Sequence, residues 1–289
     1  MDTATLLKKV RRIEIKTKGL SKHIFSGEYH SAFKGRGMSF SEVRDYTYGD
    51  DVRNIDWNVT ARTGEPHVKV FEEERELTMM LVIDMSQSNY FATKGSFKSD
   101  LYTEIAAVLS FSAINNNDKV GLILFSDKVE KYIPPKKGKK HILRIIRELI
   151  NFEPKSRGTN IGDALRYFTN VIKKRSICFV ISDYHDGDYE AALRIASKKH
   201  DMIGLRIHDS FEENIPDVGL IRVEDTEGRH TEILDTSSKK HREQLQNTFK
   251  DHAHYYQKVF PKCGADILQI STDETYVHAL LKFFKKRKR

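Results

Sequence analysis

The chain contains short apolar runs that alternate with amphipathic segments of helical spacing. Runs without polar alternation are typical of strands buried on both faces of a parallel sheet. Segments with an apolar residue every three or four positions predict helices of about ten to fifteen residues between them. This alternation predicts an α/β fold with a doubly wound, mostly parallel sheet. The predicted strands span residues 79–83, 120–125, 129–133, 177–181, 202–207 and 266–270, and the predicted helices 100–115, 141–150, 161–172, 189–199 and 274–285.

Two regions depart from this alternation. Before residue 76 only the stretch 3–17 predicts an amphipathic helix, and glycines interrupt the chain that follows. We therefore predict a loop-rich N-terminal segment with short strands over residues 1–75, and an α/β domain over residues 76–289 with a hairpin and a long helix inserted at about 210–260. The local elements predicted here are a short helix from Ser41 to Tyr46, period-two spacing at Ile55, Trp57 and Val59, a strand at Val68 and Val70, hairpin strands at 220–224 and 231–234 around the turn Asp225–Gly228, and a polar helix from Ser238 to about Tyr256.

Composition favours a soluble protein of a reducing compartment. The 289 residues include 39% hydrophobic and 31% charged residues, which indicates a core beneath a heavily charged surface. Two cysteines are too few for a disulfide framework. No apolar stretch approaches the roughly 18 residues of a membrane helix, and the N-terminus lacks a signal-peptide hydrophobic region. We therefore expect a cytoplasmic protein without a transmembrane segment.

The net charge of +8 is concentrated at the C-terminus. Lys285–Arg289 supply five positive charges, so the remainder carries +3 (8 − 5). Such a tail can bind nucleic acid by neutralising phosphates. Aromatic residues are not interleaved with it as a single-strand binding platform requires. We expect a solvated tail, with nucleic-acid binding as an alternative.

Oxygen-bearing side chains follow two predicted core strands and precede one predicted helix. The run 79–83 leads into Asp84, Ser86 and Ser88, and the run 177–181 leads into Ser182 and Asp183. Thr159 precedes the helix 161–172. Because ligands bind at the carboxyl edge of open α/β sheets, we expect these three loops to converge there.

Such a set of side chains suits a hard divalent cation. Mg²⁺ takes about six oxygen ligands, retains several waters and uses only one or two carboxylates. Two serines, one threonine and two aspartates meet that demand, and Mn²⁺ is an alternative. Because the hydroxyls are neutral, the bound ion keeps positive character and seeks an acidic side chain from a partner. This ligand set predicts binding rather than hydrolysis.

The pattern D-x-S-x-S after a buried strand, followed by G-T before a helix and S-D after a later strand, resembles the metal-ion-dependent adhesion site (MIDAS) of von Willebrand factor A domains. The resemblance covers roughly residues 76–210 and the last strand and helix. It implies Asp84, Ser86, Ser88 and Thr159 as direct or near-direct ligands and Asp183 as a ligand through water.

The flanking sequence resembles the bacterial DUF58 family. In that family a similar segment precedes a von Willebrand A-like domain, and members commonly accompany MoxR-type AAA+ ATPases in assembling or activating other proteins. The resemblance therefore implies such an ATPase, or its client, as a partner. The matching motifs are Gly35-x-Gly37, Phe40-x-x-x-Arg44-x-Tyr46-x-x-Gly49-Asp50-Asp51-x-Arg53-x-Ile55-Asp56-Trp57, Ala61-Arg62, Glu74-Arg75 and Asp209-x-x-Glu212-x-x-Ile215-Pro216.

Arginines and aspartates are concentrated in the N-terminal segment. One interpretation is internal bracing of a loop-rich segment by arginine–carboxylate pairs. The other is a contact surface for a partner. The candidate partner-binding residues are Arg44, Asp50, Arg53, Asp56, Trp57 and Arg62.

The leading prediction is a non-enzymatic, metal-dependent protein-interaction module. The alternative is a metal-dependent phosphoester hydrolase with His185 or His208 near the ion, since both follow core strands at the same sheet edge. Neither histidine has an evident nucleophile and orienting acid in the sequence.

Overall fold

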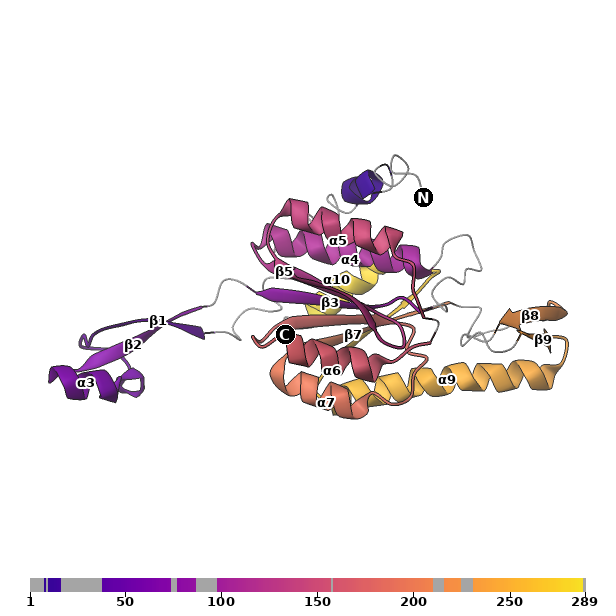
Figure 1. Ribbon diagram of the computed structural model, residues 1–289. Helices are drawn as coiled ribbons and strands as arrows, with labels where there is room; N and C mark the ends of the chain where they lie inside the picture. The colour runs from indigo at the N-terminus through magenta and orange to yellow at the C-terminus, as the bar shows by residue number, and fades with distance from the viewer. Residues whose placement is uncertain are drawn as a thin grey trace.

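A six-stranded sheet forms the centre of the computed structural model, which describes residues 8, 10–16, 38–73, 77–86, 98–156, 158–209, 216–224 and 231–287 (Figure 1). The strand order is β10-β7-β6-β3-β4-β5. Five strands are parallel, and only the edge strand β5 is antiparallel to its neighbour. The predicted fold class is therefore confirmed. The strands are β3 (Thr78–Asp84), β4 (Lys119–Phe125), β5 (Val129–Lys136), β6 (Ile177–Ser182), β7 (Asp201–His208) and β10 (Asp266–Ser271).

Helices cover both faces of this sheet (Figure 1). Because successive residues of a strand point to opposite faces, Leu81 and Ile83 of β3 join one hydrophobic cluster while Met80 and Val82 join the other. This double burial explains why the core strands have unbroken apolar runs. One face packs against α4 (Lys98–Asn115), α5 (Lys139–Asn151) and α10 (Tyr276–Arg287), and the other against α6 (Ile161–Val171), α7 (Glu190–Lys199) and α9 (Lys239–Lys262).

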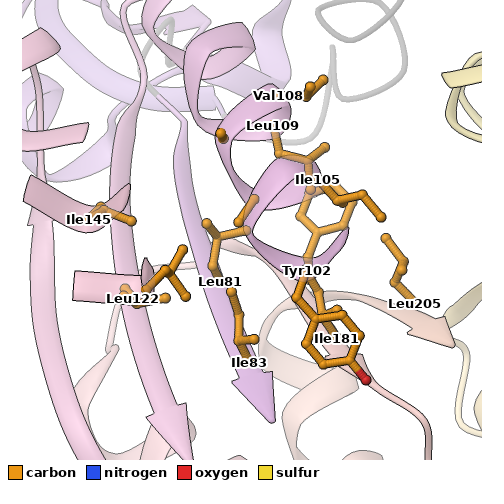
Figure 2. Packing of buried hydrophobic residues seen from close by; sticks show 14 of the residues in the cluster. Leu81, Ile83, Tyr102, Ile105, Val108, Leu109, Leu122, Ile145, Ile181 and Leu205 are labelled. Atoms are coloured by element: carbon orange, nitrogen blue, oxygen red, sulfur yellow. The ribbon is translucent and has the colours of Figure 1, made fainter. Parts of the chain in front are cut away.

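Helix α4 lies across the middle of the first face. Figure 2 shows Tyr102, Ile105 and Leu109 of α4 beside Leu81 of β3 and Ile181 of β6, all of them fully buried. The helical residues 10–16 add Val10 and Ile13 to the same cluster. Two ion pairs tie this segment to the helices beneath it, Glu14 with Lys139 at 2.6 Å and Lys16 with Glu104 at 2.6 Å. The described part of the predicted N-terminal helix is thus confirmed.

One strand and one helix extend further than predicted, because prolines in the strand and polar residues in the helix suggested an earlier end. Strand β5 continues through Pro134 and Pro135 to Lys136 instead of ending at Ile133. An edge strand tolerates proline because one side of it needs no ladder partner. Helix α9 runs past Tyr256 to Lys262, since Tyr256, Val259 and Phe260 are buried against the sheet.

The N-terminal segment is more regular than predicted. Strands β1 (Met38–Asp45) and β2 (His67–Glu73) form an antiparallel pair, so the predicted helix from Ser41 to Tyr46 is wrong. Residues Trp57–Thr63 form helix α3, so the predicted extended spacing at Trp57 and Val59 is also wrong. The cause is capping: the Asp56 carboxylate accepts hydrogen bonds from the N–H groups of Asn58 (3.0 Å) and Val59 (3.3 Å). A local side-chain bond therefore outweighs a weak periodicity.

The predicted hairpin in the inserted region is confirmed. Strands β8 (Leu220–Glu224) and β9 (Thr231–Asp235) pair antiparallel in a separate two-stranded sheet. The predicted turn Asp225–Gly228 lies outside the described residues. Among the helices that the structure describes, none has the length and apolar character needed to cross a membrane.

His200 makes the stability of the fold sensitive to acid. Its ring packs against that of Phe168 at a tilt of 52° (centroids 4.5 Å apart), and burial, with the nearby Lys199 and Arg175, lowers its pKa to about 4. The unfolded chain therefore binds a proton first as the pH falls below about 6.5, and stability decreases from there towards pH 4. We expect the wild type to lose about 1–2 kcal/mol more than His200→Phe between pH 7 and pH 5 in urea unfolding. His241→Phe, at an exposed position of α9, is the control and should behave as the wild type. Equal pH dependence in His200→Phe would contradict the prediction.

Candidate metal centre

Asp84 and Ser182 lie side by side at the carboxyl ends of neighbouring parallel strands. The register pairs Ile83 with Ile181, so the next residue of each strand reaches the same edge. The Ser182 hydroxyl donates a hydrogen bond to Asp84 Oδ2 (2.7 Å), and the Ser86 N–H donates to Asp84 Oδ1 (2.9 Å). All three residues are buried. The ends of β3 and β6 thus hold a fixed, buried carboxylate, as the sequence pattern predicts.

Asp183 sits at a tight left-handed turn after β6. Tyr184 has φ of 62°, a conformation that most side chains avoid. Its N–H donates to the Ser182 hydroxyl (2.9 Å) and its own hydroxyl donates to the Val180 carbonyl (2.7 Å). Its ring packs against Tyr256 of α9, with centroids 4.5 Å apart. The packing of this ring therefore holds the strained turn that carries Asp183.

Two buried carboxylates and two buried cations occupy this edge. Burial raises the pKa of Asp84, and repulsion from the Asp183 carboxylate raises this pKa further. A positive charge beside the two carboxylates would relieve their repulsion. Lys98 Nζ lies 3.5 Å from Asp183 Oδ2, and Arg206 Nε donates to the Asp183 carbonyl (3.4 Å). All four side chains are at most 1% exposed.

The loop before α6 is held against the same edge by its backbone. The Asn160 N–H donates to the Ser126 carbonyl (2.8 Å), directly after β4, and the Ile161 N–H donates to Asp186 Oδ2 (2.7 Å), in the loop after β6. The Asn160 side chain caps α6 by accepting from the Asp163 N–H (2.8 Å). Thr159 precedes these anchors and is half-buried. The loop before α6 is therefore held against the loops that follow β4 and β6.

Of the five predicted ligands, the structure brings Asp84, Ser86 and Asp183 into one buried cluster and Thr159 to the adjoining loop, while Ser88 lies outside the described residues. Their oxygens are of the kind that Mg²⁺ and Mn²⁺ accept, and two mutually repelling carboxylates favour a cation. Within the described ranges no three His, Cys, Asp or Glu residues form a metal-binding group. An ion here would therefore depend on hydroxyl ligands as well as on the carboxylates.

Sequence reasoning missed Lys98 and Arg206. Lys98 begins α4 and shares its buried stripe with Tyr102 and Ile105, at helical spacings of four and seven. A lysine in line with core residues, just after the D-x-S-x-S loop, is the signal that could have identified it. Arg206 lies within the apolar run of β7, where a charged residue marks a polar interior site.

His185 lies at the same sheet edge as the carboxylate cluster. Its Nδ1 lies 3.5 Å from Asp183 Oδ2, and its ring lies 5.6 Å from that of His252 on α9.

Part of the C-terminal basic run belongs to a helix. Helix α10 extends to Arg287, which pairs with Asp201 and with Asp266 (3.3 Å). Arg287 therefore contributes to the fold, contrary to the predicted solvated tail.

The candidate partner-binding residues of the N-terminal segment divide into two groups. Arg44 and Asp50 form a two-pronged pair (Nη1–Oδ2 2.8 Å, Nη2–Oδ1 2.7 Å), which holds the pKa of Asp50 well below its usual range. Asp56 caps α3 and approaches Lys69 at 3.5 Å. These three residues brace the segment internally.

The remaining candidates are available to a partner. The Trp57 residue is 70% exposed, Arg62 is exposed, and Arg53 is exposed although its guanidinium pairs with Asp51 (3.2 Å). Tyr48 and Val52, which sequence reasoning did not single out, are large exposed hydrophobic residues of the same segment. Figure 1 shows β1, β2 and α3 beyond one end of the central sheet. Exposed aromatic side chains flanked by arginines are typical of protein-interaction surfaces.

Comparison with known proteins gives a family without a described activity. The family described as "Protein of unknown function DUF58" matches residues 42–255. Uncharacterized protein Rv1480 of Mycobacterium tuberculosis is 26% identical over 292 residues, covering 100% of this chain and 92% of its own length. Uncharacterized protein Mb1516 of Mycobacterium bovis gives the same values. Neither relative carries the name of an enzyme.

Comparison with solved structures gives matches of low sequence identity. The conserved hypothetical protein BatB from Bacteroides thetaiotaomicron has a TM-score of 0.48 at 16% identity, covering 73% of this chain and 98% of its own. The SpRpn10 VWA domain has a TM-score of 0.37 at 11% identity, covering 72% of this chain and 94% of its own.

Proposed function

Since the chain belongs to the DUF58 family, we propose that it is a non-enzymatic, divalent-cation-dependent protein-interaction module. The observation that carries this proposal is the buried pair of carboxylates, Asp84 and Asp183, at the edge where three loops meet. The residues that would hold Mg²⁺ or Mn²⁺ are Asp84, Ser86, Ser88, Thr159 and Asp183.

The chain's own residues favour binding over hydrolysis. Ser182 fixes Asp84 through a 2.7 Å hydrogen bond, and the Tyr184 turn fixes Asp183, so both carboxylates are oriented before any ligand arrives. A bound cation supplies an attachment point for a carboxylate of another protein, because neutral hydroxyl ligands leave it positively charged.

The partner in this proposal is a protein that presents an acidic residue, such as a MoxR-type AAA+ ATPase or its client. Two surfaces would contact it: the cation site and the exposed side chains of Tyr48, Val52, Trp57, Arg53 and Arg62. A cytoplasmic location suits such a partner and stays a prediction.

The test is co-purification with the MoxR-type ATPase of the same organism, in Mg²⁺ and in a chelator. We expect binding in Mg²⁺ that falls about tenfold or more in the chelator and in Asp84→Ala, because loss of a central ion-mediated contact costs at least about 1.4 kcal/mol. Trp57→Ala is expected to weaken binding in both conditions.

Asp188→Ala provides the matched control. Asp188 lies in the loop after β6, close to Asp183 in sequence, but it is exposed. This variant should bind as the wild type does. Equal binding of wild type and Asp84→Ala, with or without Mg²⁺, would exclude the cation-dependent mechanism.

A further inference from the structure

A lysine ammonium is buried within the cluster that we propose as the cation site. Lys98 is 1% exposed, and its Nζ lies 3.5 Å from Asp183 Oδ2, in a carboxylate that is fully buried. A buried ammonium is costly unless a carboxylate or hydrogen-bond acceptors compensate it. The side chain therefore occupies the neighbourhood of Asp183 that a bound metal ion would also need.

Two buried cations already lie beside Asp183. Lys98 Nζ is 3.5 Å from its carboxylate and Arg206 Nε donates to its carbonyl, and all three side chains are at most 1% exposed. A divalent cation bound at Asp183 would therefore place further positive charge next to a buried ammonium. Like charges at short range repel strongly there, so the ion and the ammonium oppose one another.

The two cations of the cluster differ in what they contact. Arg206 lies within β7, between the neighbouring strands β6 and β10, and contacts the backbone carbonyl of Asp183. Lys98 is the first residue of α4 and contacts the carboxylate itself. An ion bound to Asp183 would need the same carboxylate oxygens that Lys98 contacts, whereas Arg206 contacts the backbone. Lys98 is therefore the cation that competes with an ion.

We propose that Lys98 is a built-in counter-ion that competes with the divalent cation for Asp183. This inference rests on the proposed cation site. The ammonium compensates the Asp183 carboxylate when no ion is bound, and it sets the ion affinity lower than the carboxylates alone would give.

The experiment measures Mn²⁺ binding to the full chain from the electron paramagnetic resonance signal of free Mn²⁺. Lys98→Met keeps the length and apolar stem of the side chain but removes its charge. We expect this variant to bind Mn²⁺ about tenfold or more tightly than the wild type, the size of a typical coupling between two sites. Lys98→Gln, which retains a hydrogen-bond donor, should show the same direction and replaces Lys98→Met if the latter does not fold.

Two controls separate this effect from a general loss of positive charge. Lys128→Met removes an exposed lysine from the loop after β4, at the same sheet edge, and should leave Mn²⁺ affinity unchanged. Lys98→Met/Asp84→Ala should lose the tight binding. Thermal unfolding gives a second readout: Mn²⁺ should raise the unfolding temperature of Lys98→Met over that in chelator by more than it does for the wild type.

The outcomes distinguish the two proposals. Equal Mn²⁺ affinity of wild type and both Lys98 variants overturns the counter-ion role and leaves the cation site intact. Absence of Mn²⁺ binding to the wild type and to both variants overturns the cation site and the counter-ion role together. Tighter binding that survives Asp84→Ala also overturns the proposal, because the ion would then be held elsewhere.

Discussion

Replacing Asp183 with leucine is expected to lower the free energy of unfolding by about 3 kcal/mol, measured by urea denaturation at neutral pH in a chelator. The variant removes the carboxylate 3.5 Å from the buried Lys98 ammonium and with it a charge that compensates this ammonium. Removing one member of a buried ion pair is costly for this reason. Relief of the repulsion between Asp183 and Asp84 offsets part of the loss and places it at the low end of the usual range.

A double-mutant cycle tests the cause of this loss. Lys98→Met/Asp183→Leu replaces both charges with apolar groups and should recover most of the lost stability, because exchanging a whole buried pair is often nearly neutral. Asp188→Ala, at an exposed position of the same loop, should change stability by less than about 0.5 kcal/mol. A double variant no more stable than Asp183→Leu would show that Lys98 does not depend on this carboxylate.

Replacing Phe260 with alanine is expected to cost about 3–5 kcal/mol of unfolding free energy. Its fully buried ring fills the space above Gly204 of β7, where an added Cβ would lie only 2.5 Å from Phe260 Cε1. The ring also meets Tyr184 edge-on, with centroids 5.3 Å apart. The cavity would therefore loosen the turn that positions Asp183, so weaker Mn²⁺ binding should accompany the lower stability.

The fit between Phe260 and Gly204 can be tested directly. Gly204→Ala alone should be destabilising by about 1–3 kcal/mol, because the Phe260 ring would have to move away from β7 to admit the methyl group and would lose packing contacts. Gly204→Ala with Phe260→Leu should cost less than the sum of the two single changes, since the smaller side chain admits the new methyl group. Ile195→Ala, at a position 55% exposed on α7, is the control and should change stability by less than about 1 kcal/mol. Strict additivity of the two changes would contradict the proposed contact.

Local patterns of apolar and polar residues determined most of the sheet and helices. The run Met79–Ile83 is apolar at every position because both of its faces are buried, and this requirement is visible in the sequence itself. Asp84, Ser182 and Asp183 follow such runs directly, so their arrival at one edge follows from parallel strands ending together. Spacing alone does not show which local hydrogen bonds form. The Asp56 side chain caps α3, so residues 57–63 are helical where the spacing predicted a strand.

Only the tertiary structure decided which charges are buried. Lys98 and Arg206 occupy positions in line with apolar core residues, but only the fold shows that both are buried beside Asp183, whereas Lys128 is exposed. The sequence likewise contained the candidate arginines and aspartates of the N-terminal segment, but it did not distinguish Arg44 and Asp50, which bind each other, from the exposed Arg53 and Arg62. The reason is physical: whether a charge is tolerated in the interior depends on partners that lie far away along the chain, and their distances exist only once the strands have paired and the helices have packed.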